Sequence, residues 1–559
     1  MNRKTILLMS ALALAAACEK AKPADKPAPA APERTDVLYV TPVQHLLRVS
    51  MDLRGTRPTI AELEDIEANP DKIASYIDAY MADPRFAERV KEIWNEGYLT
   101  RQDKPFFLGA PELRDFVSAD EFAKASGNEP LELIAHVVTE DRPFTEVVTA
   151  NYTMANGVLA SYFDITRPDG SGPGWVESTY TDGRPMAGVL SSTDFHTRWR
   201  TTDSNKNRGR ANAWMRATLC YDFLSRDINV DTALDLSDPN VVNNAVRTNQ
   251  SCAGCHQTLD PLGSFLYGWY VPEDPPMMDQ VVSYPIKTYS LDLEPRWQQN
   301  TGRDPGFFGL DAGSRLDGLG KAISEDPRFS LCSVKRFQGA LTGKNIADLS
   351  FDETDRLNDW FVKENYSAKK LIKEIMLSPE YRIYGPAADS SKDVVGLKLT
   401  SPEALDRMLN DLTGFEWKLD FPLGYDLLQN DIYGFREMAG GYDSIYVTAP
   451  AYTVNATHIL MLRMAAADGA GKVVEQEFTG GNRRLLTKVQ VTDTTPAKIE
   501  EQAVALNKLL YGMTIDASGP EAADVNTLWQ KAYTRSGDVK YAWKVTLAAM
   551  LSDVRIAFY

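Results

Sequence analysis

The sequence predicts a mainly α-helical, multi-domain protein built from partly duplicated helical modules, with minor β structure near the C-terminus. The composition is globular, with 43% apolar and 25% charged residues. A chain of 559 residues is longer than one compact fold of about 100 to 200 residues. Helix-start signals recur along the chain, whereas strand-like alternation is weak and local. Several helical units are therefore expected.

The first residues predict an export signal. Arg3 and Lys4 precede an apolar run of 12 residues, 6–17, which is typical of a signal-peptide core and too short to span a membrane. The run ends in Leu14-Ala-Ala-Ala-Cys18, which resembles a bacterial lipobox, although its leucine lies one residue further from the cysteine than usual. We expect a lipid on Cys18. An ordinary secretory signal with an incidental cysteine is the alternative.

A tether follows the cysteine. Residues 19–35 are rich in Pro, Ala, Lys and Glu, cannot form a core and predict an extended linker. Glu19, rather than Asp, follows the cysteine and resembles an outer-membrane address of Gram-negative bacteria. We therefore expect a lipid-anchored protein of the bacterial cell envelope, on the periplasmic or surface face of the outer membrane. The formal charge of −17 disfavours nucleic-acid binding.

Local signals locate several elements. The capping box Thr59-Ile-Ala-Glu62 predicts a helix over 60–68. An N-cap residue followed by proline predicts further helix starts at Asp83-Pro84, Ser401-Pro402 and Thr495-Pro496. The best strand-like alternation covers 443–447 and 484–491. The stretch 166–184 holds four glycines and two prolines, and predicts a long loop at a module boundary.

The chain also echoes itself. At one constant offset, a set of six residues recurs: Thr41, Leu46, Arg48, Asp52, Leu53 and Gly55 return as Thr400, Leu405, Arg407, Asp411, Leu412 and Gly414. Two shorter strings also repeat: Met376-Leu-Ser378 as Met550-Leu-Ser552, and Asp83-Pro-Arg-Phe86 as Asp326-Pro-Arg-Phe329. Duplicated helical modules around an insert explain these matches. Accidental repetition of helical composition is the alternative.

The insert contains Cys252-Ala-Gly-Cys255-His256. Two thiols three residues apart on a helical turn can add to the two vinyl groups of one haem, and the next imidazole then ligates the iron. A redox-active thiol pair and a metal site are the alternatives, but no second Cys-x-x-Cys or paired histidine completes a zinc site. The motif predicts one covalently attached haem c, held by Cys252, Cys255 and His256.

A family resemblance surrounds this motif. Residues 252–263 followed by Trp269, with Gly188-Val-Leu-Ser191 and Asn207-Arg-Gly-Arg210 upstream, are similar to cytochrome-c-like lipoproteins of unknown function that are common in planctomycetes and myxobacteria. Further matches to companion domains of these proteins lie at 141–153, at 52–62 and at 367–382. The resemblance implies an exported, haem-bearing, multi-domain helical protein, and it implies no particular reaction.

The second axial ligand of the iron is left open. Met186 follows Pro185 at the start of the segment that resembles the haem domain, where the family often has histidine. His196 lies in the same module and is the second candidate, ahead of Met277 and Met278, and an open site is a further alternative.

Asp260 lies four residues after His256, where it either hydrogen-bonds the imidazole or ends the helix before Pro261.

Two further features lie near the motif. The stretch 198–216 holds six basic residues against one acid, which suits haem propionates, an acidic docking partner or simply a solvated loop. Cys220 and Cys332 remain as a candidate disulfide in an oxidising compartment.

These observations predict the following organisation: a signal peptide (1–17), a lipidated cysteine with its tether (18–38), an N-terminal helical module (39–165), a haem-binding cytochrome-c-like module (166–290), a helical module that closes the first block (291–390) and a second helical module that echoes the N-terminal one (391–559).

The expected function is electron transfer through one haem, with the membrane as partner through the lipid and another redox protein as electron partner. A haem-dependent oxidoreductase and a binding or scaffold lipoprotein with structural haem are the alternatives. The sequence does not decide whether the protein is an enzyme, because it contains no serine-nucleophile elbow, phosphate loop or zinc-protease helix.

Overall fold

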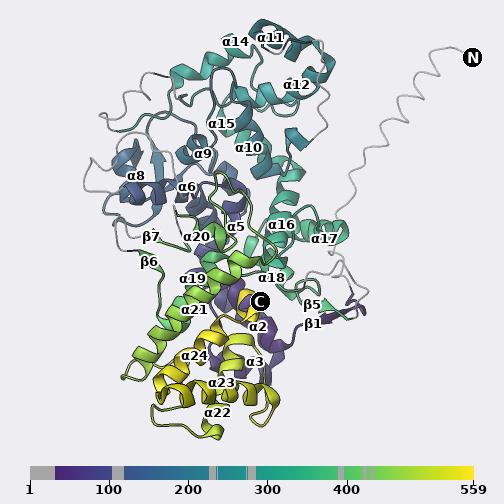
Figure 1. Cartoon of the computed structure of the whole chain (residues 1–559). Coiled ribbons are helices and arrows are strands. Elements are labelled where there is room, and N and C mark those ends of the chain that lie inside the picture. Colours follow the sequence, from purple (N-terminus) through teal and green to yellow (C-terminus); the bar gives the residue numbers. More distant parts are fainter. Residues whose placement is uncertain are drawn as a thin grey trace, which may run out of the picture.

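The structure is a computed structural model that describes residues 32–102, 119–225, 234–235, 237–271, 274, 285–387, 396–419, 425–429 and 433–559. These residues form mainly helices with a few short strands, which confirms the predicted fold class (Figure 1). None of the helices within these ranges has both the length and the apolar character needed to cross a bilayer.

The first block, residues 32–387, is the larger part. Its N-terminal elements are β1 (Val37–Tyr39), α2 (Pro42–Arg54), α3 (Ile60–Ala68), η1 (Pro70–Lys72), α4 (Ile73–Met81), α5 (Arg85–Tyr98) and α6 (Ala119–Thr139). Its middle elements are α7 (Glu146–Thr149), β2 (Thr153–Ala155), α8 (Gly157–Tyr162), β3 (Ile165–Thr166), β4 (Val176–Tyr180), α9 (Thr193–Arg198), α10 (Arg208–Leu219), η3 (Phe223–Ser225), α11 (Pro239–Thr248) and α12 (Gln250–Ser264). It ends with η5 (Leu291–Arg296), α14 (Trp297–Asn300), α15 (Leu316–Glu325), α16 (Pro327–Thr342), α17 (Phe351–Lys363), α18 (Ala368–Leu377) and β5 (Ile383–Pro386).

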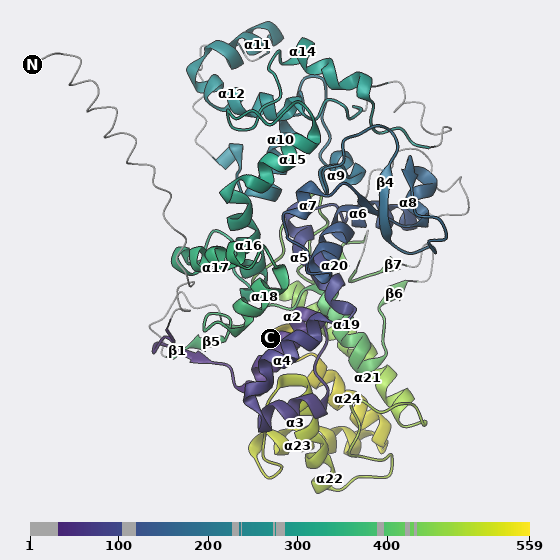
Figure 2. The same ribbon diagram turned by 180° about the vertical axis from the view of Figure 1, so that it is seen from behind.

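The second block, residues 396–559, is a smaller helical unit. Its elements are α19 (Pro402–Thr413), β6 (Lys418–Leu419), β7 (Tyr425–Asp426), α20 (Phe435–Met438), α21 (Ala456–Glu477), α22 (Pro496–Tyr511), α23 (Pro520–Ser536), α24 (Val539–Leu551) and α25 (Val554–Ala557). In Figures 1 and 2, α22 and α23 lie at one end of the molecule, and α11, α12 and α14 lie at the other.

Both blocks close in the same way. In the first block, β1 pairs antiparallel with β5, so the segment before α2 meets the segment after α18. In the second block, the segment before α19 meets the last residues, where Leu399 pairs antiparallel with Phe558 and Lys398 exchanges two backbone hydrogen bonds with Tyr559. Helices α2 and α19 both end at a left-handed glycine, Gly55 and Gly414. Both blocks thus join their first segment to their last, and the two helices of the sequence echo end at the same kind of cap.

The shorter repeated string, Asp-Pro-Arg-Phe, makes the same hydrogen bonds in both copies. Asp83 accepts hydrogen bonds from the backbone N–H of Arg85 (2.9 Å) and from its guanidinium. Asp326 accepts the same pair of bonds from Arg328. In each copy the following phenylalanine is buried. The repeated string is thus a helix-start motif that fixes an arginine against its own aspartate.

The two blocks have separate apolar cores that meet at α2. One core runs through the first block from Val43 to Tyr381. The other gathers α19 and α21–α25. Helix α2 contributes Val49 and Leu53 to the first core and Leu47 and Met51 to the second. Because opposite faces of one helix serve both cores, α2 joins the blocks.

The predicted caps agree with the structure in most cases. The capping box at Thr59 opens α3, and Ser401-Pro402 and Thr495-Pro496 open α19 and α22. At Asp83-Pro84 the helix α5 begins at Arg85, one residue later than the signal predicted. The stretch 166–184 is not one long loop, since β4 lies within it and pairs with β2 and β3.

Both segments predicted as strands from their alternation are wrong. Residues 484–491 and 443–447 lie outside every strand that the structure describes. Side chains take the backbone donors that a strand partner would use: Glu477 accepts from the N–H groups of 484, 485 and 486, and Asp443 accepts from those of 445, 446 and 447. These loops are therefore fixed by buried carboxylates.

Candidate functional site

The Cys-x-x-Cys-His motif lies in the first half of helix α12. The helix starts after Asn249, whose side-chain oxygen accepts a hydrogen bond from the N–H of Ser251 at 3.0 Å. Cys252 and Cys255 are free thiols, and both are partly exposed. The sequence folds in this way because an N-cap precedes a continuous helical run. The motif is therefore held on a regular helix.

The three motif residues share one face of α12. At 100° per residue, Cys252, Cys255 and His256 fall within about 100° of the helix circumference. One and two turns later the same face carries Leu259 and Gly263, which are buried. The face that packs into the protein in the second half of the helix thus presents two thiols and an imidazole in the first half. This arrangement fits a haem that would extend the buried surface.

His256 is oriented by a buried carboxylate. Its Nδ1 lies 3.0 Å from Oδ1 of Asp260, which leaves Nε2 as the nitrogen available to a metal. Helix α12 continues through Pro261 to Ser264, so Asp260 lies within the helix rather than at its end. Of the two readings of Asp260, the structure supports the contact with the imidazole.

Asp260 is also bound by Arg208, the first residue of α10. The guanidinium donates from Nε to Oδ1 (2.7 Å) and from Nη2 to Oδ2 (3.1 Å). The Asp260 side chain is only 2% exposed. Burial alone would raise the pKa of this carboxyl, but the hydrogen bonds from His256 and Arg208 lower it below its usual value. The sequence did not predict the Arg208 contact, which spans 52 residues.

Met186 lies away from the motif helix. Its side chain packs against the small apolar cluster that includes Phe122, Tyr162 and Tyr180, beside the three-stranded sheet. The described contacts of Met186 therefore place it in a core, which is the ordinary role of a methionine. Met277 and Met278 lie outside the described residues, as does Cys18.

His196 is buried beside the far end of α12. Its Nε2 donates to the carbonyl of Leu190 (3.0 Å), and its ring stacks on Trp269 with a centroid distance of 3.7 Å. Burial lowers the pKa of His196 well below its usual value, so the ring is neutral at neutral pH. Trp269 follows the end of α12, and about 12 Å of helix separates His256 from Ser264. The structure does not bring His196 to the motif.

The six basic residues of 198–216 serve different partners. Arg208 binds Asp260, and Lys206 donates to the carbonyl of Asn300. Arg210 is buried and donates to the carbonyls of Trp199 and His196. Arg198 and Arg216 both lie over the ring of Trp199, and Arg200 is exposed. Most of the basic side chains in this stretch therefore make contacts within the protein.

Arg303 is a basic residue near the motif that the sequence did not single out. Its Nε is buried without a hydrogen-bond partner and lies 4.0 Å from Oδ2 of Asp260. No sequence signal connects it to the motif, because its position depends on how the segment after α14 packs on α12. Within the described residues, no group of three or more His, Cys, Asp or Glu side chains is arranged to hold a metal ion.

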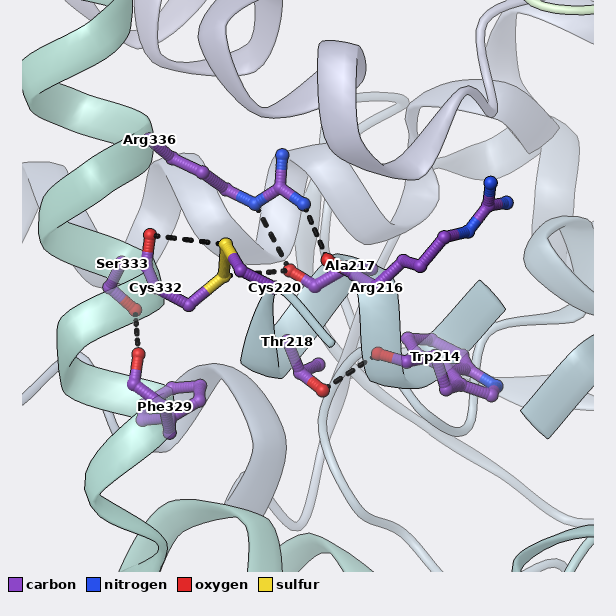
Figure 3. The surroundings of a disulfide bond; sticks show 9 residues. All are labelled: Trp214, Arg216, Ala217, Thr218, Cys220, Phe329, Cys332, Ser333 and Arg336. Carbon is purple, nitrogen blue, oxygen red and sulfur yellow. Dashed lines mark hydrogen bonds between the residues drawn. A yellow bond between two sulfur atoms is a disulfide. The ribbon is translucent and has the colours of Figure 1, made fainter. Parts of the chain in front are cut away.

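A disulfide joins Cys220, at the end of α10, to Cys332 of α16 (Figure 3). Arg336, one turn further along α16, donates to the carbonyls of Ala217 (3.1 Å) and Arg216 (2.7 Å) in the last turn of α10. The pairing left open by the sequence is thus present. The bond closes a loop of the chain that contains the Cys-x-x-Cys-His motif.

A separate cavity of about 90 Å³ lies where the two blocks meet. Helix α5 contributes Glu96, and the second block contributes Tyr442 and Tyr452. Burial raises the pKa of Glu96 to about 7, although Lys398 and Arg336 oppose this shift. A carboxyl group that titrates near neutral pH in a cavity suits proton exchange with a bound molecule. No sequence pattern pointed to Glu96.

Comparisons with known proteins give one match. A family described as PSCyt2, a protein of unknown function (DUF1549), matches residues 36–122. This range covers β1 and α2–α5, and it includes residues 52–62, which carried part of the resemblance described above. No curated protein and no solved structure matches the chain. The N-terminal part of the first block is therefore similar to a family of unknown function.

Proposed function

We propose that this chain is a c-type haem protein of the bacterial envelope that transfers electrons through one covalently bound haem. The observation that carries the proposal is the placement of Cys252, Cys255 and His256 on one face of α12, with the imidazole already oriented by Asp260. The disulfide between Cys220 and Cys332 supports an oxidising compartment, where such haem attachment takes place.

In this proposal each residue of the site has a distinct role. Cys252 and Cys255 provide the thiols for attachment, and His256 presents Nε2 while Asp260 holds Nδ1. A bound haem supplies a one-electron Fe(III)/Fe(II) couple. The lipid on Cys18 would keep the protein at the outer membrane, and a second redox protein would exchange electrons with it.

The direct test is covalent haem. The chain is produced in a host with cytochrome c maturation and denatured, and its reduced haemochrome spectrum is recorded. One c-type haem per chain is expected. The variant Cys252→Ala/Cys255→Ala should lose it, whereas Gln257→Ala, an exposed change on the same helix, should keep it. Noncovalent haem, or none, in the wild type would refute the proposal.

The distal ligand is tested separately. If Met186 ligates the iron, the oxidised protein shows the near-infrared sulfur-to-iron band of His/Met ligation, and Met186→Ala removes it. Loss of the low-spin signal in His196→Ala alone would assign the histidine instead. Because the described contacts hold both side chains elsewhere, either assignment requires them to move when haem binds.

The anchor is tested by Cys18→Ser, which removes the acylated thiol and leaves every described domain unchanged. The variant should leave the membrane fraction. Retention in the membrane would show that the attachment lies elsewhere.

A second candidate function is a haem-dependent oxidoreductase acting on a small substrate. The cavity with Glu96 favours it, because its carboxyl can exchange a proton near neutral pH. A high-spin iron that binds carbon monoxide readily in the wild-type protein would favour this candidate over the carrier. A low-spin iron that excludes carbon monoxide would favour the carrier.

A further inference from the structure

A chain of hydrogen bonds links two helices at the motif. It runs from the Arg208 guanidinium of α10, through the Asp260 carboxylate, to the His256 imidazole of α12. The exposed fractions of these side chains are 15%, 2% and 22% in the same order. The carboxylate is therefore the buried centre of the chain, and only the imidazole approaches the surface.

The contact fixes both the tautomer and the angle of the ring. An ionised carboxylate only accepts hydrogen bonds, so the proton lies on Nδ1 of His256 and the lone pair on Nε2. A carboxylate on the second nitrogen of a ligating histidine raises the basicity of the ligand. A ring held by a backbone carbonyl would be less electron-rich.

The carboxylate itself has little freedom to turn away. Two parallel bonds from Arg208 occupy both of its oxygens. The loop before Arg208 packs directly on α12, since a Cβ atom on Gly263 would lie 3.0 Å from the carbonyl oxygen of Lys206. The backbone contact and the ion pair therefore hold α10 and α12 in one register.

We propose that Asp260, held by Arg208, is a positioning residue that lowers the reduction potential of the haem iron bound by His256. The inference rests on the proposed haem function and extends it. An electron-rich imidazole stabilises Fe(III) more than Fe(II), so removing the carboxylate should favour Fe(II). The protein would then work as a low-potential electron carrier or donor.

The test is potentiometry on the intact holoprotein. Asp260→Asn should shift the Fe(III)/Fe(II) equilibrium toward Fe(II) by about tenfold or more, which is about 59 mV for one electron. The hyperfine-shifted resonance of the His256 Nδ1 proton in the NMR spectrum of the oxidised protein should also move, because that proton loses its carboxylate acceptor. Asp260→Glu, which keeps a carboxylate, should restore most of both values.

Two further variants distinguish an effect of the Asp260 carboxylate on the imidazole from a general effect of charge near the haem. Asp304→Asn removes an exposed negative charge in the first block and should shift the equilibrium less than about twofold, since exposed charges are screened. Arg208→Gln leaves the carboxylate in place but removes the cation that competes with His256 for its charge, and should shift the equilibrium toward Fe(III), opposite to Asp260→Asn, by a smaller amount.

Haem content distinguishes failure of the proposed haem function from failure of the proposed role of Asp260. If the wild type carries no covalent haem, the proposed function fails. If wild type, Asp260→Asn and Arg208→Gln all carry one haem and share one potential and one His256 Nδ1 proton shift, the inference about Asp260 is overturned while the proposed function stands.

Discussion

Asp52 of α2 ties the two blocks together at the level of a single side chain. Its carboxylate accepts hydrogen bonds from the hydroxyl groups of Tyr381 and Tyr559, each at 2.8 Å, and pairs with Lys398. Tyr381 follows the last long helix of the first block, and Tyr559 follows that of the second. One buried acid thus satisfies donors from both ends of the repeat.

Asp52→Ala should destabilise the protein by about 3 to 5 kcal/mol, because it leaves the ammonium of Lys398 and two phenols without their acceptor in a buried place. Urea unfolding at pH 7 measures the loss.

The repeat supplies the matched control. Asp411 occupies the position of Asp52 in the echo, but it pairs with Arg484, whose side chain is 48% exposed. Asp411→Ala should cost less than about 1 kcal/mol. Equal losses of stability in the two variants would show that the buried contacts of Asp52 stabilise the protein no more than the exposed ion pair of Asp411.

Asp194 predicts a pH dependence of stability. Burial raises its pKa to about 7, and Oδ2 has no hydrogen-bond partner, although Oδ1 accepts from Ser126 at 2.8 Å. The folded state therefore holds a proton that the unfolded chain releases near pH 4, and this contribution to stability is lost as the pH rises from about 4 to about 7.

Asp194→Asn removes the ionisation. Relative to the wild type, the variant should therefore gain about 2 to 4 kcal/mol between pH 5 and pH 8. Urea midpoints at the two pH values test this, with the exposed Asp524→Asn as control. A constant difference between Asp194→Asn and the wild type across the range would contradict the prediction.

At the scale of elements, helix starts were predictable and strands were not. Thr59, Ser401 and Thr495 signal their helices through groups within four residues, so local sequence suffices. The loops at 443–447 and 484–491 alternate like strands, but Asp443 and Glu477 capture their backbone donors. Glu477 acts across seven to nine residues, and no alternation pattern reveals that.

Part of the candidate site could likewise be predicted from local sequence, and part of it could not. The motif and the position of Asp260 four residues after His256 are local, so the sequence contained both. Whether the helix continued through Pro261 was open, and packing of its second half decides it. Arg208 and Glu96 depend on contacts between distant elements, which a single sequence does not specify.

The two left-handed helix ends give a prediction about elements. Gly55 (φ +70°) and Gly414 (φ +68°) end α2 and α19. A Cβ atom at Gly414 would approach only the tip of the Gln476 side chain, whereas one at Gly55 would lie 2.5 Å from Nε of Arg407, which pairs with Glu92.

Gly414→Ala should therefore cost about 1 kcal/mol from backbone strain, and Gly55→Ala about 2 to 3 kcal/mol because the Arg407 ion pair must also shift. Thermal unfolding of the two variants compares them directly. The reverse order would show that the Arg407 contact yields without cost.

At the scale of the whole molecule, α2 makes the blocks interdependent. Its residues enter both apolar cores, and Arg407 of α19 pairs with Glu92 of α5 across the junction. The junction also contains the cavity with Glu96. The duplicated units therefore form one body with a shared helix.

The disulfide constrains this body over a long range, since 112 residues separate Cys220 from Cys332. Removing it with Cys220→Ala/Cys332→Ala should lower the stability by about 2 to 5 kcal/mol, mainly because the unfolded chain gains freedom. Thermal midpoints without reductant measure the loss.

The same comparison in strong reductant is the control, because the wild type then loses the bond as well and the two midpoints should converge. Identical midpoints without reductant would mean that the bond does not contribute to the folded state.

The burial of Cys332 in the Cys220–Cys332 bond has a consequence for the order of maturation. Haem attachment needs Cys252 and Cys255 as thiols, in a compartment that oxidises exposed pairs. Cys332 is 2% exposed, although Cys220 is partly exposed like both motif cysteines. A reductant that reaches the motif would be kept from the Cys332 sulfur once the first block has folded around it. Folding of the first block would therefore precede haem loading, and a chain reduced before it folds would offer four equivalent thiols to the attachment machinery instead of two.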